Sequence, residues 1–428
     1  MAHDSNKRVL LKQSLMMNDN QHIPSGYKPS PLGFIPEDWE VKRLGEIGSF
    51  KNGLNFTPNE DGFSYYFLGV SDFQDKTDIH ANELNQIQLA NELDKEYHLK
   101  DDDLVFVRSN GSKSLVGRCV IIHANHVKAT YSGFCIRFRT TGEETSTRYI
   151  KHIIDAGYLQ RFLQYEGRGT NITNLNQEIL GRLTFPLPDL KEQQNILNAL
   201  SLWDTAIAKQ TALIEQLTLR KCGLMQQLLT GKKRLKGFEG GTFLRLGNYI
   251  SECNRRNAGC NRVLSVTNTR GFILQEEQFD KIVASNDTSN YKVVRRGEFA
   301  YNPSRVNVGS LAMLNNYDEG ILSPMYIVFK ANENIDKTYL LQCLQSWWFR
   351  GHIPAYTQGS VRDSLSFDGL CSMKFYIPTL QEQKAISAIL EQADKEIEIQ
   401  KQKLAAMQEQ KKGLMQVLLT GKKRTSTN

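Results

Sequence analysis

The sequence predicts an α/β (α+β) protein in which two repeated globular domains are separated by two long helices that form an antiparallel coiled coil. Three observations predict this architecture. The segment GLMQQLLTGKKR at Gly223 returns as GLMQVLLTGKKR at Gly413, 190 residues later. Apolar residues recur at heptad spacing through both copies. The segments that precede the two helices are rich in short β patterns. An internal repeat sets the architecture, so it is interpreted first.

Each predicted helix has a start signal and a stop signal. The motif Pro-x-Leu-x-Glu-Gln begins at Pro188 and again at Pro378, and proline costs little at a helix start. Gly231 and Gly421 provide the stops, and the Lys-Lys-Arg that follows each is favourable beside the negative helix end. About forty residues lie between these signals, or roughly 60 Å of helix. The predicted N-caps with their capping-box partners are Asp189 with Glu192 and Thr379 with Glu382.

The apolar period indicates that the two helices pair. An alternative, in which each helix packs separately on its own domain, leaves too little globular surface to cover so long a helix. If the pairing is antiparallel with aligned ends, we expect Gln210 and Gln400 to lie within about one turn of each other. Polar residues at such positions fix the register of a coiled coil. The predicted seam residues are Ile196, Leu200, Trp203, Ile207, Gln210, Ile214, Leu217, Leu224, Leu228, Ile386, Leu390, Ile397, Gln400, Leu404, Met407, Leu414 and Leu418.

The globular segments are alike in kind but not in sequence. Each opens with Leu-Gly, at Leu44 and at Leu246, and each closes with a Gly-(Thr/Ser) loop and a short helix. A duplicated unit whose globular parts have diverged suits a protein that recognises two different targets at a fixed separation. The predicted boundaries are a flexible N-terminal segment at 1–37, a first domain at 38–186, a central helical spacer at 187–234, a linker at 235–242, a second domain at 243–376 and a C-terminal helical spacer at 377–424.

The composition limits the classes of protein to which this chain can belong. The net charge of +7 permits a polyanionic partner without requiring one. No apolar run has the length of a membrane span and no signal peptide is evident, so we expect a cytoplasmic protein without a membrane partner. The seven cysteines are scattered, without a CxxC pair. Neither the pair Cys253 and Cys260 nor the HxxH at His123 has the context of a metal site, so no metal is predicted.

The paired Pro-x-Leu-x-Glu-Gln starts and Leu-Leu-Thr-Gly-Lys-Lys-Arg ends resemble those of the specificity subunit of type I restriction–modification systems, and GFIPEDWEVKRLGEIG from Gly33 resembles that family's usual entrance to its first domain. The resemblance covers nearly the whole chain. It implies two target recognition domains, each reading one half of a bipartite, asymmetric DNA sequence, and a coiled coil that sets their spacing. It also implies partners: two adenine methyltransferase (modification) subunits and two restriction (helicase-nuclease) subunits, in a system of DNA methylation and phage defence.

The same resemblance implies that the chain is not an enzyme and has no cofactor of its own, because S-adenosylmethionine, ATP and Mg²⁺ would be used by the partner subunits. The residues agree. The TGKKR tails end helices and lack the first glycine of a P-loop. YNPSR at Tyr301 lacks the second proline and the aromatic residue of the amino-methyltransferase motif. Two alternatives stay open: a coiled-coil scaffold that binds proteins, and a silent donor of recognition domains without a DNA target of its own.

Sequence readout requires directed donors and acceptors on rigidly held loops. Arginine suits guanine, and asparagine or glutamine suits adenine. Such residues gather in two loops of each domain, at positions that correspond between the two copies. The candidate DNA-binding residues are Arg108, Ser109, Asn110, Ser112, Lys113, Arg168, Thr170, Asn171, Thr173 and Asn174 in the first domain, and Tyr301, Asn302, Ser304, Arg305, Asn307, Gln358, Ser360 and Arg362 in the second.

Overall fold

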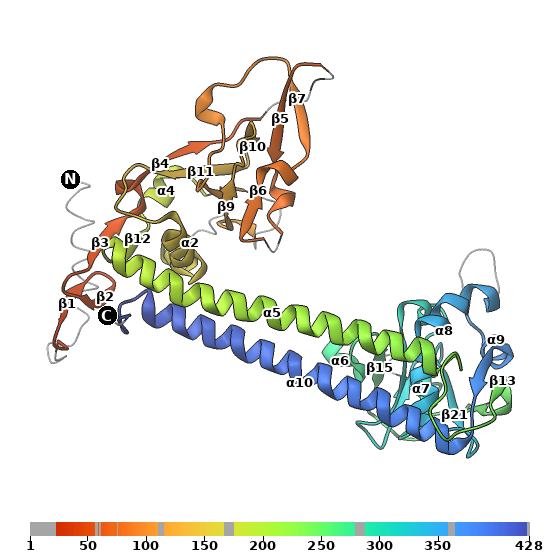
Figure 1. The fold of residues 1–428 in the computed structure, drawn as a ribbon. Helices are drawn as coiled ribbons and strands as arrows, with labels where there is room; N and C mark the ends of the chain where they lie inside the picture. Colours follow the sequence, from red (N-terminus) through yellow and green to blue (C-terminus); the bar gives the residue numbers. More distant parts are fainter. Residues whose placement is uncertain are drawn as a thin grey trace. The chain divides into compact units, whose positions relative to one another are not determined.

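The computed structural model describes residues 23–55, 59, 61–74, 76–109, 115–166, 175–278, 287–357 and 364–425. The chain divides into two compact units. Unit 1 is Met1–Ala208 with Ala405–Asn428, and unit 2 is Lys209–Leu404. The two long helices, α5 (Leu190–Leu228) and α10 (Leu380–Leu418), therefore each contribute one part to each unit (Figure 1). Each unit contains a globular domain, the start of the helix that follows it and the end of the other helix.

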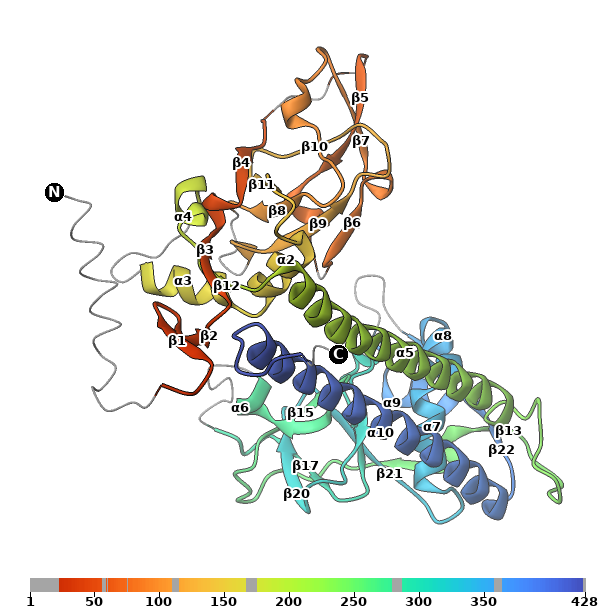
Figure 2. The same ribbon diagram turned by 60° about the vertical axis from the view of Figure 1, so that its left-hand side comes forward.

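The globular part of unit 1 is built on a five-stranded sheet with the order β4-β11-β8-β9-β6, beside a three-stranded sheet β10-β5-β7 (Figure 2). The strands are β1 (Tyr27–Ser30), β2 (Gly33–Pro36), β3 (Glu40–Arg43), β4 (Gly48–Asn52), β5 (Phe63–Leu68), β6 (Asp78–His80), β7 (Gln86–Leu89), β8 (Leu104–Val107), β9 (Cys119–His123), β10 (Ala129–Tyr131), β11 (Cys135–Thr140) and β12 (Thr184–Leu187). The shorter helices are α2 (Thr147–Asp155), α3 (Tyr158–Glu166) and α4 (Gln177–Gly181).

Unit 2 has a four-stranded sheet with the order β14-β21-β18-β19, and two-stranded sheets β15-β16 and β17-β20. Its strands are β13 (Thr242–Arg245), β14 (Ile250–Glu252), β15 (Leu264–Thr267), β16 (Gly271–Leu274), β17 (Lys292–Arg295), β18 (Phe299–Tyr301), β19 (Leu311–Met313), β20 (Glu319–Leu322), β21 (Ile327–Ala331) and β22 (Lys374–Ile377). Its shorter helices are α6 (Gln275–Gln278), α7 (Lys337–Gln345), α8 (Trp347–His352) and α9 (Phe367–Ser372).

The repeated Leu-Gly dipeptide closes each domain on itself. The amide of Leu44 donates to the carbonyl of Leu183, and that of Leu246 donates to Met373, both at 2.9 Å. Both leucines are fully buried. Beside them, β3 pairs antiparallel with β12, and β13 with β22, so the first strand of each domain joins its last. Glycine suits this close approach, because a Cβ on Gly45 would lie 3.1 Å from the backbone oxygen of Gly181, closer than an ordinary van der Waals contact.

Residues 27–36 form an ordered hairpin, so the prediction of a flexible segment over 1–37 is wrong for this stretch. β1 and β2 pair antiparallel. The Tyr27 hydroxyl donates to the carbonyl of Gly421 at 2.8 Å, and Ile35 lies in the core of unit 1. An isolated two-stranded hairpin is marginally stable in water. The surface that stabilises this one comes from the end of α10, which no local pattern around residue 30 could reveal.

The long helices pair antiparallel within each unit. In unit 1 the start of α5 packs against the end of α10, with Ile196, Leu200 and Leu418 in one apolar cluster. In unit 2 the start of α10 packs against the end of α5, with Leu228 and Leu390 in another. Every predicted seam residue is buried or half-buried. Both helices have 39 residues and begin and end at equivalent positions of the repeat, which confirms the predicted fold.

Charged and polar pairs fix the register of this seam. Gln210 donates from Nε2 to Oε1 of Gln400 at 2.8 Å and to its backbone carbonyl at 3.1 Å, as the aligned antiparallel arrangement predicts. The two lysines that interrupt the seam make equivalent ion pairs, Lys221 with Asp394 at 2.6 Å and Lys411 with Asp204 at 2.5 Å. Among the described residues, no helix is long and apolar enough to cross a bilayer, and no cluster of three metal-ligand side chains occurs.

The glutamine pair is testable by a double-mutant cycle. Replacing Gln210 with Leu leaves the amide of Gln400 without its partner, so we expect a cost of about 1–3 kcal/mol and a lower melting temperature. The double variant Gln210→Leu, Gln400→Leu should recover most of that loss, because both unpaired groups are gone. Thermal unfolding of the single variants Gln210→Leu and Gln400→Leu and of the double variant, beside the parent chain, measures the coupling. Additive losses would show that the two amides do not interact.

Candidate nucleic-acid interface

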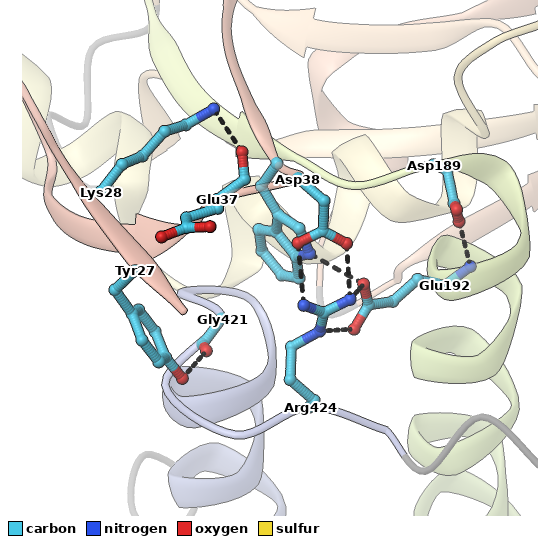
Figure 3. Close-up of polar contacts among 9 residues, drawn as sticks. Tyr27, Lys28, Glu37, Asp38, Asp189, Glu192, Gly421 and Arg424 are labelled. Atoms are coloured by element: carbon cyan, nitrogen blue, oxygen red, sulfur yellow. Dashed lines mark hydrogen bonds and ion pairs between the residues drawn. The ribbon is translucent and has the colours of Figure 1, made fainter. Parts of the chain in front are cut away.

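The start of each long helix is anchored by its Glu-Gln dipeptide. In unit 1, Arg424 donates from Nε to Oε1 of Glu192 at 2.6 Å and from Nη2 to Oε2 at 2.7 Å (Figure 3). Arg424 also makes a two-bond contact with Asp38 at 2.8 and 2.9 Å. The indole of Trp39 donates to Glu192 at 2.8 Å. The Glu192 side chain, 4% exposed, thus has both carboxylate oxygens paired inside the protein. We call this arrangement the unit 1 latch.

These contacts shift the protonation equilibria of the latch. The paired carboxylates, Glu192 first and then Asp38, raise the pKa of the Arg424 guanidinium. The hydrogen bond from Arg424 lowers the pKa of Asp38. The guanidinium of Arg424 and the carboxylate of Asp38 are therefore held in their charged forms at neutral pH. A buried carboxylate is stable only when paired and hydrogen-bonded, so the arginine and the glutamate depend on each other.

Unit 2 has the equivalent latch. Arg234 donates to Glu382 through Nε at 3.0 Å and through Nη2 at 2.6 Å, and the Glu382 side chain is 1% exposed. Asp189 does cap α5, since it accepts from the Glu192 amide at 2.8 Å. However, the predicted capping-box role of Glu192 and Glu382 is wrong. Their carboxylates bind the Lys-Lys-Arg tail of the other helix, because an arginine offers a charged two-bond partner that a single backbone amide cannot match.

The glutamine of the dipeptide joins each helix to its own domain. Gln193 accepts from the Ser146 amide at 2.9 Å through Oε1, while its Nε2 donates to the carbonyl of Pro188 at 2.9 Å. Gln383 accepts from the Asp336 amide at 2.8 Å and donates to the carbonyl of Pro378 at 2.9 Å. Ser146 and Asp336 are the N-cap residues of α2 and α7. In each unit the glutamate of the dipeptide therefore binds the tail of the other long helix. The glutamine joins its own helix to the domain that precedes it.

The two units differ where α2 and α7 face the coiled coil. Gln342 of α7 donates to Oδ2 of Asp394 at 3.3 Å. At the equivalent place in α2 stands His152, whose Nδ1 is buried and has no hydrogen-bond partner among the described residues. Burial lowers the pKa of His152, and the nearby Lys411 lowers it further, against the opposing effect of Asp155 and Asp204. The neutral imidazole is thus favoured in the folded protein.

The candidate DNA-contacting loops leave the sheets at corresponding places. In unit 1 the chain leaves β8 at Arg108, whose carbonyl accepts from the Leu175 amide at 2.9 Å. In unit 2 it leaves β18 into Asn302 and Pro303, and the Pro303 carbonyl accepts from the Leu365 amide at 3.1 Å. The same crosslink therefore ties the first loop of each domain to the segment that precedes α4 or α9. Rigid support of this kind is what base readout requires.

The loop of unit 2 presents several predicted side chains to solvent. Ser304, Arg305 and Asn307 are exposed and Asn302 is half-buried. Asn302 accepts from the Ser304 amide at 3.1 Å, and Asn307 accepts from the Val308 amide at 2.9 Å. A short 3-10 helix, η7 (Val306–Val308), completes the loop. The guanidinium of Arg305 and the side-chain amides of Asn302 and Asn307 are thus carried on a folded, hydrogen-bonded turn.

Tyr301 is not part of this surface, and its predicted contact with DNA is corrected. The side chain is fully buried between strands, and its hydroxyl donates to the carbonyl of Leu365 at 3.2 Å. Burial raises its pKa well above the usual range of tyrosine. It supports the loop from beneath. In the first domain Arg108 and Ser109 are half-buried. The other predicted contacts lie outside the described residues: Asn110, Ser112, Lys113, Arg168, Thr170, Asn171, Thr173, Asn174, Gln358, Ser360 and Arg362.

Comparison with known proteins settles the family. The family described as Type I restriction modification DNA specificity domain matches residues 36–219 and 273–409. This chain belongs to that family. It is 24% identical over 424 residues to the type I restriction enzyme MjaVIII specificity subunit of Methanocaldococcus jannaschii, covering 91% of this chain and 93% of the relative. It is 32% identical over 167 residues to the StySPI specificity subunit of Salmonella potsdam, covering 37% and 35%.

A solved structure from work on complex assembly and conformational transition of the type I restriction–modification system has the same fold. Its chain aligns with 90% of this one and 99% of itself, at a TM-score of 0.59 and 15% identity. The recognition of the family from the repeated helix starts and ends is confirmed. The fold of this specificity-domain protein therefore matches that of the solved chain.

The unit 1 latch is testable by charge removal. Replacing Arg424 with Gln leaves a buried carboxylate with one partner fewer, and we expect a loss of about 1–3 kcal/mol, less than for a fully buried pair because the arginine is partly exposed. Hydrogen exchange should accelerate in the first turns of α5. Lys422→Gln is the matched control, since it removes the same charge two residues away without touching Glu192. Equal effects of both variants would contradict the role of the ion pair.

His152 predicts an acid-sensitive unit 1. Its folded pKa lies below the ordinary value of 6.5, so the unfolded chain binds the proton first as the pH falls, and stability present above pH 6.5 is progressively lost below it. We expect the melting temperature of His152→Gln, which copies the residue of unit 2, to fall less than that of the parent chain between about pH 7 and pH 5. Parallel curves for the two proteins would contradict this assignment.

Proposed function

We propose that this chain is the sequence-reading subunit of a type I restriction–modification complex. Each globular domain reads one half of a bipartite, asymmetric DNA target. α5 and α10 hold the two domains apart, so the spacer between the half-sites is read only as length. The observation that carries this proposal is the match of the specificity-domain family to both halves of a duplicated chain, whose frame contacts recur at equivalent positions while the loop residues differ.

The chain supplies recognition, and the chemistry belongs to its partners. Two adenine methyltransferase subunits use S-adenosylmethionine, and two restriction subunits use ATP and Mg²⁺. They dock on the helices and on the adjacent domain surfaces. This division is supported by the family and by the exposed loop residues, which are donors and acceptors suited to bases and phosphates. Specific binding should weaken steeply with salt, because phosphate contacts release counterions.

Adenine-methylation mapping tests the proposal. A host that expresses this chain with its neighbouring methyltransferase is compared with a host that lacks only this chain. We expect a bipartite motif that disappears with the chain. Exchanging residues 38–186 for the corresponding region of another specificity subunit should change one half of the motif and leave the other half and the spacer intact. The reciprocal exchange of residues 243–376 is the matched control.

Two results would overturn it. The first is an active methyltransferase with no motif that depends on the chain, which would favour a protein scaffold or a silent donor of recognition domains. The second is a change of both half-sites on exchange of one domain, because modular reading requires that each half be read independently.

A further inference from the structure

Two large apolar side chains stand exposed at corresponding turns of the two domains. Phe134 of unit 1 is 55% exposed and Met325 of unit 2 is 62% exposed. Single exposed apolar residues are common on protein surfaces and need no explanation by themselves. What distinguishes these two is that domains of different sequence place them at one and the same point of the fold.

The backbone shows that the two turns are equivalent. The Cys135 amide donates to the Ser132 carbonyl at 2.9 Å, and the Tyr326 amide donates to the Ser323 carbonyl at 3.0 Å. Phe134 and Met325 therefore occupy the same position of the same four-residue turn. Each turn leads directly into the strand, β11 or β21, that pairs with the strand before the candidate loop. Its tip is thus fixed to the centre of the sheet.

Each exposed side chain lies beside the loop proposed to contact DNA. In unit 1 the Arg108 amide donates to the Phe134 carbonyl at 2.8 Å. In unit 2 the corresponding residue is Pro303, which has no amide hydrogen to donate. The contact there is made by a side chain, as Asn302 Nδ2 approaches the Met325 sulfur at 3.5 Å. In both domains the turn therefore contacts the first residues of the candidate loop, although the interacting atoms differ.

We propose that Phe134 and Met325 contact bases directly, each through apolar contact with a thymine methyl group in the half-site read by its own domain. The inference rests on the proposed function and names specificity-determining residues for it. Thymine differs from the other bases in the major groove by its C5 methyl, which apolar side chains recognise. A flat ring in one domain and a flexible thioether in the other would read that methyl in different surroundings.

A DNA partner fits these turns better than a protein partner. A protein interface has a cluster of buried aromatic and aliphatic residues inside a polar rim. Here one exposed apolar tip stands beside the loop that carries Arg108 in unit 1, and beside Asn302 in unit 2, where the same loop carries Arg305 and the exposed Val308. Such a mixture of a few apolar side chains with cationic and amide groups is the composition of base readout.

Deoxyuridine substitution tests the inference, because it removes only the methyl group of thymine. The complex of this chain with its methyltransferase is bound to duplexes of the mapped motif in which each thymine is replaced in turn. The parent complex should lose affinity at a thymine in each half-site, by about fourfold for the contact of one methyl group. Phe134→Ala should abolish that sensitivity in one half only, and Met325→Ala in the other half only.

Phe63→Ala and Phe243→Ala are the controls, since both residues are exposed phenylalanines, 44% and 47%, away from these turns. Both controls should keep the parent profile, and the unaffected half-site of each test variant shows that the chain is folded and assembled. A parent complex insensitive to deoxyuridine, or test variants that retain the parent profile, would overturn this inference alone. A parent complex that does not prefer its motif over a scrambled duplex would overturn the proposed function itself.

Discussion

The structure depends on the reciprocal docking of two equivalent helices, in which the end of each is held by the start of the other. A helix of 39 residues has an apolar seam far longer than one domain can cover. Antiparallel pairing buries both seams at once. It also brings Arg424 to Glu192 and Arg234 to Glu382, so that each buried carboxylate receives a guanidinium from the other copy of the repeat. The repeated sequence is explained by this exchange, since neither copy satisfies its own charges.

The residues that hold the helices and domains together obey different constraints from the loops that are proposed to contact DNA. Glu192, Gln193 and their counterparts are fixed by pair geometry, because a buried carboxylate or amide that loses its partner is costly. The loops after β8 and β18 need only a stable backbone crosslink, which the amides of Leu175 and Leu365 provide. Side chains outside that crosslink can change without disturbing the seam. This separation is the physical basis on which a duplicated chain can acquire two different specificities.

The sequence predicted those features whose signals are local. Heptad spacing, the helix stops at Gly231 and Gly421 and the central glutamine pair all follow from short-range periodicity and from the repeat. The roles that failed depend on distant partners. Glu192 has the spacing of a capping box, but its carboxylate binds an arginine 232 residues away. Tyr301 has the neighbours of a contact loop, but burial between strands removes it from the surface. Helices α2 and α7 are not predicted, because short β patterns dominate the segments in which they lie.

The unequal latches show how far a duplicated frame can diverge while its geometry is kept. Arg424 is held by two carboxylates, Trp39 donates to Glu192, and Tyr27 of the N-terminal hairpin donates to the carbonyl of Gly421. The Arg234 guanidinium pairs with Glu382, and the ring of Tyr376 lies within 2.7 Å of where a Cβ on Gly231 would stand. Gly231 and Gly421 both need positive φ, at 69° and 71°, so each tail turns in the same way despite these different surroundings. The backbone turn and the arginine–glutamate pair are therefore the invariant part, and the residues packed around them are free to follow the domain to which they belong.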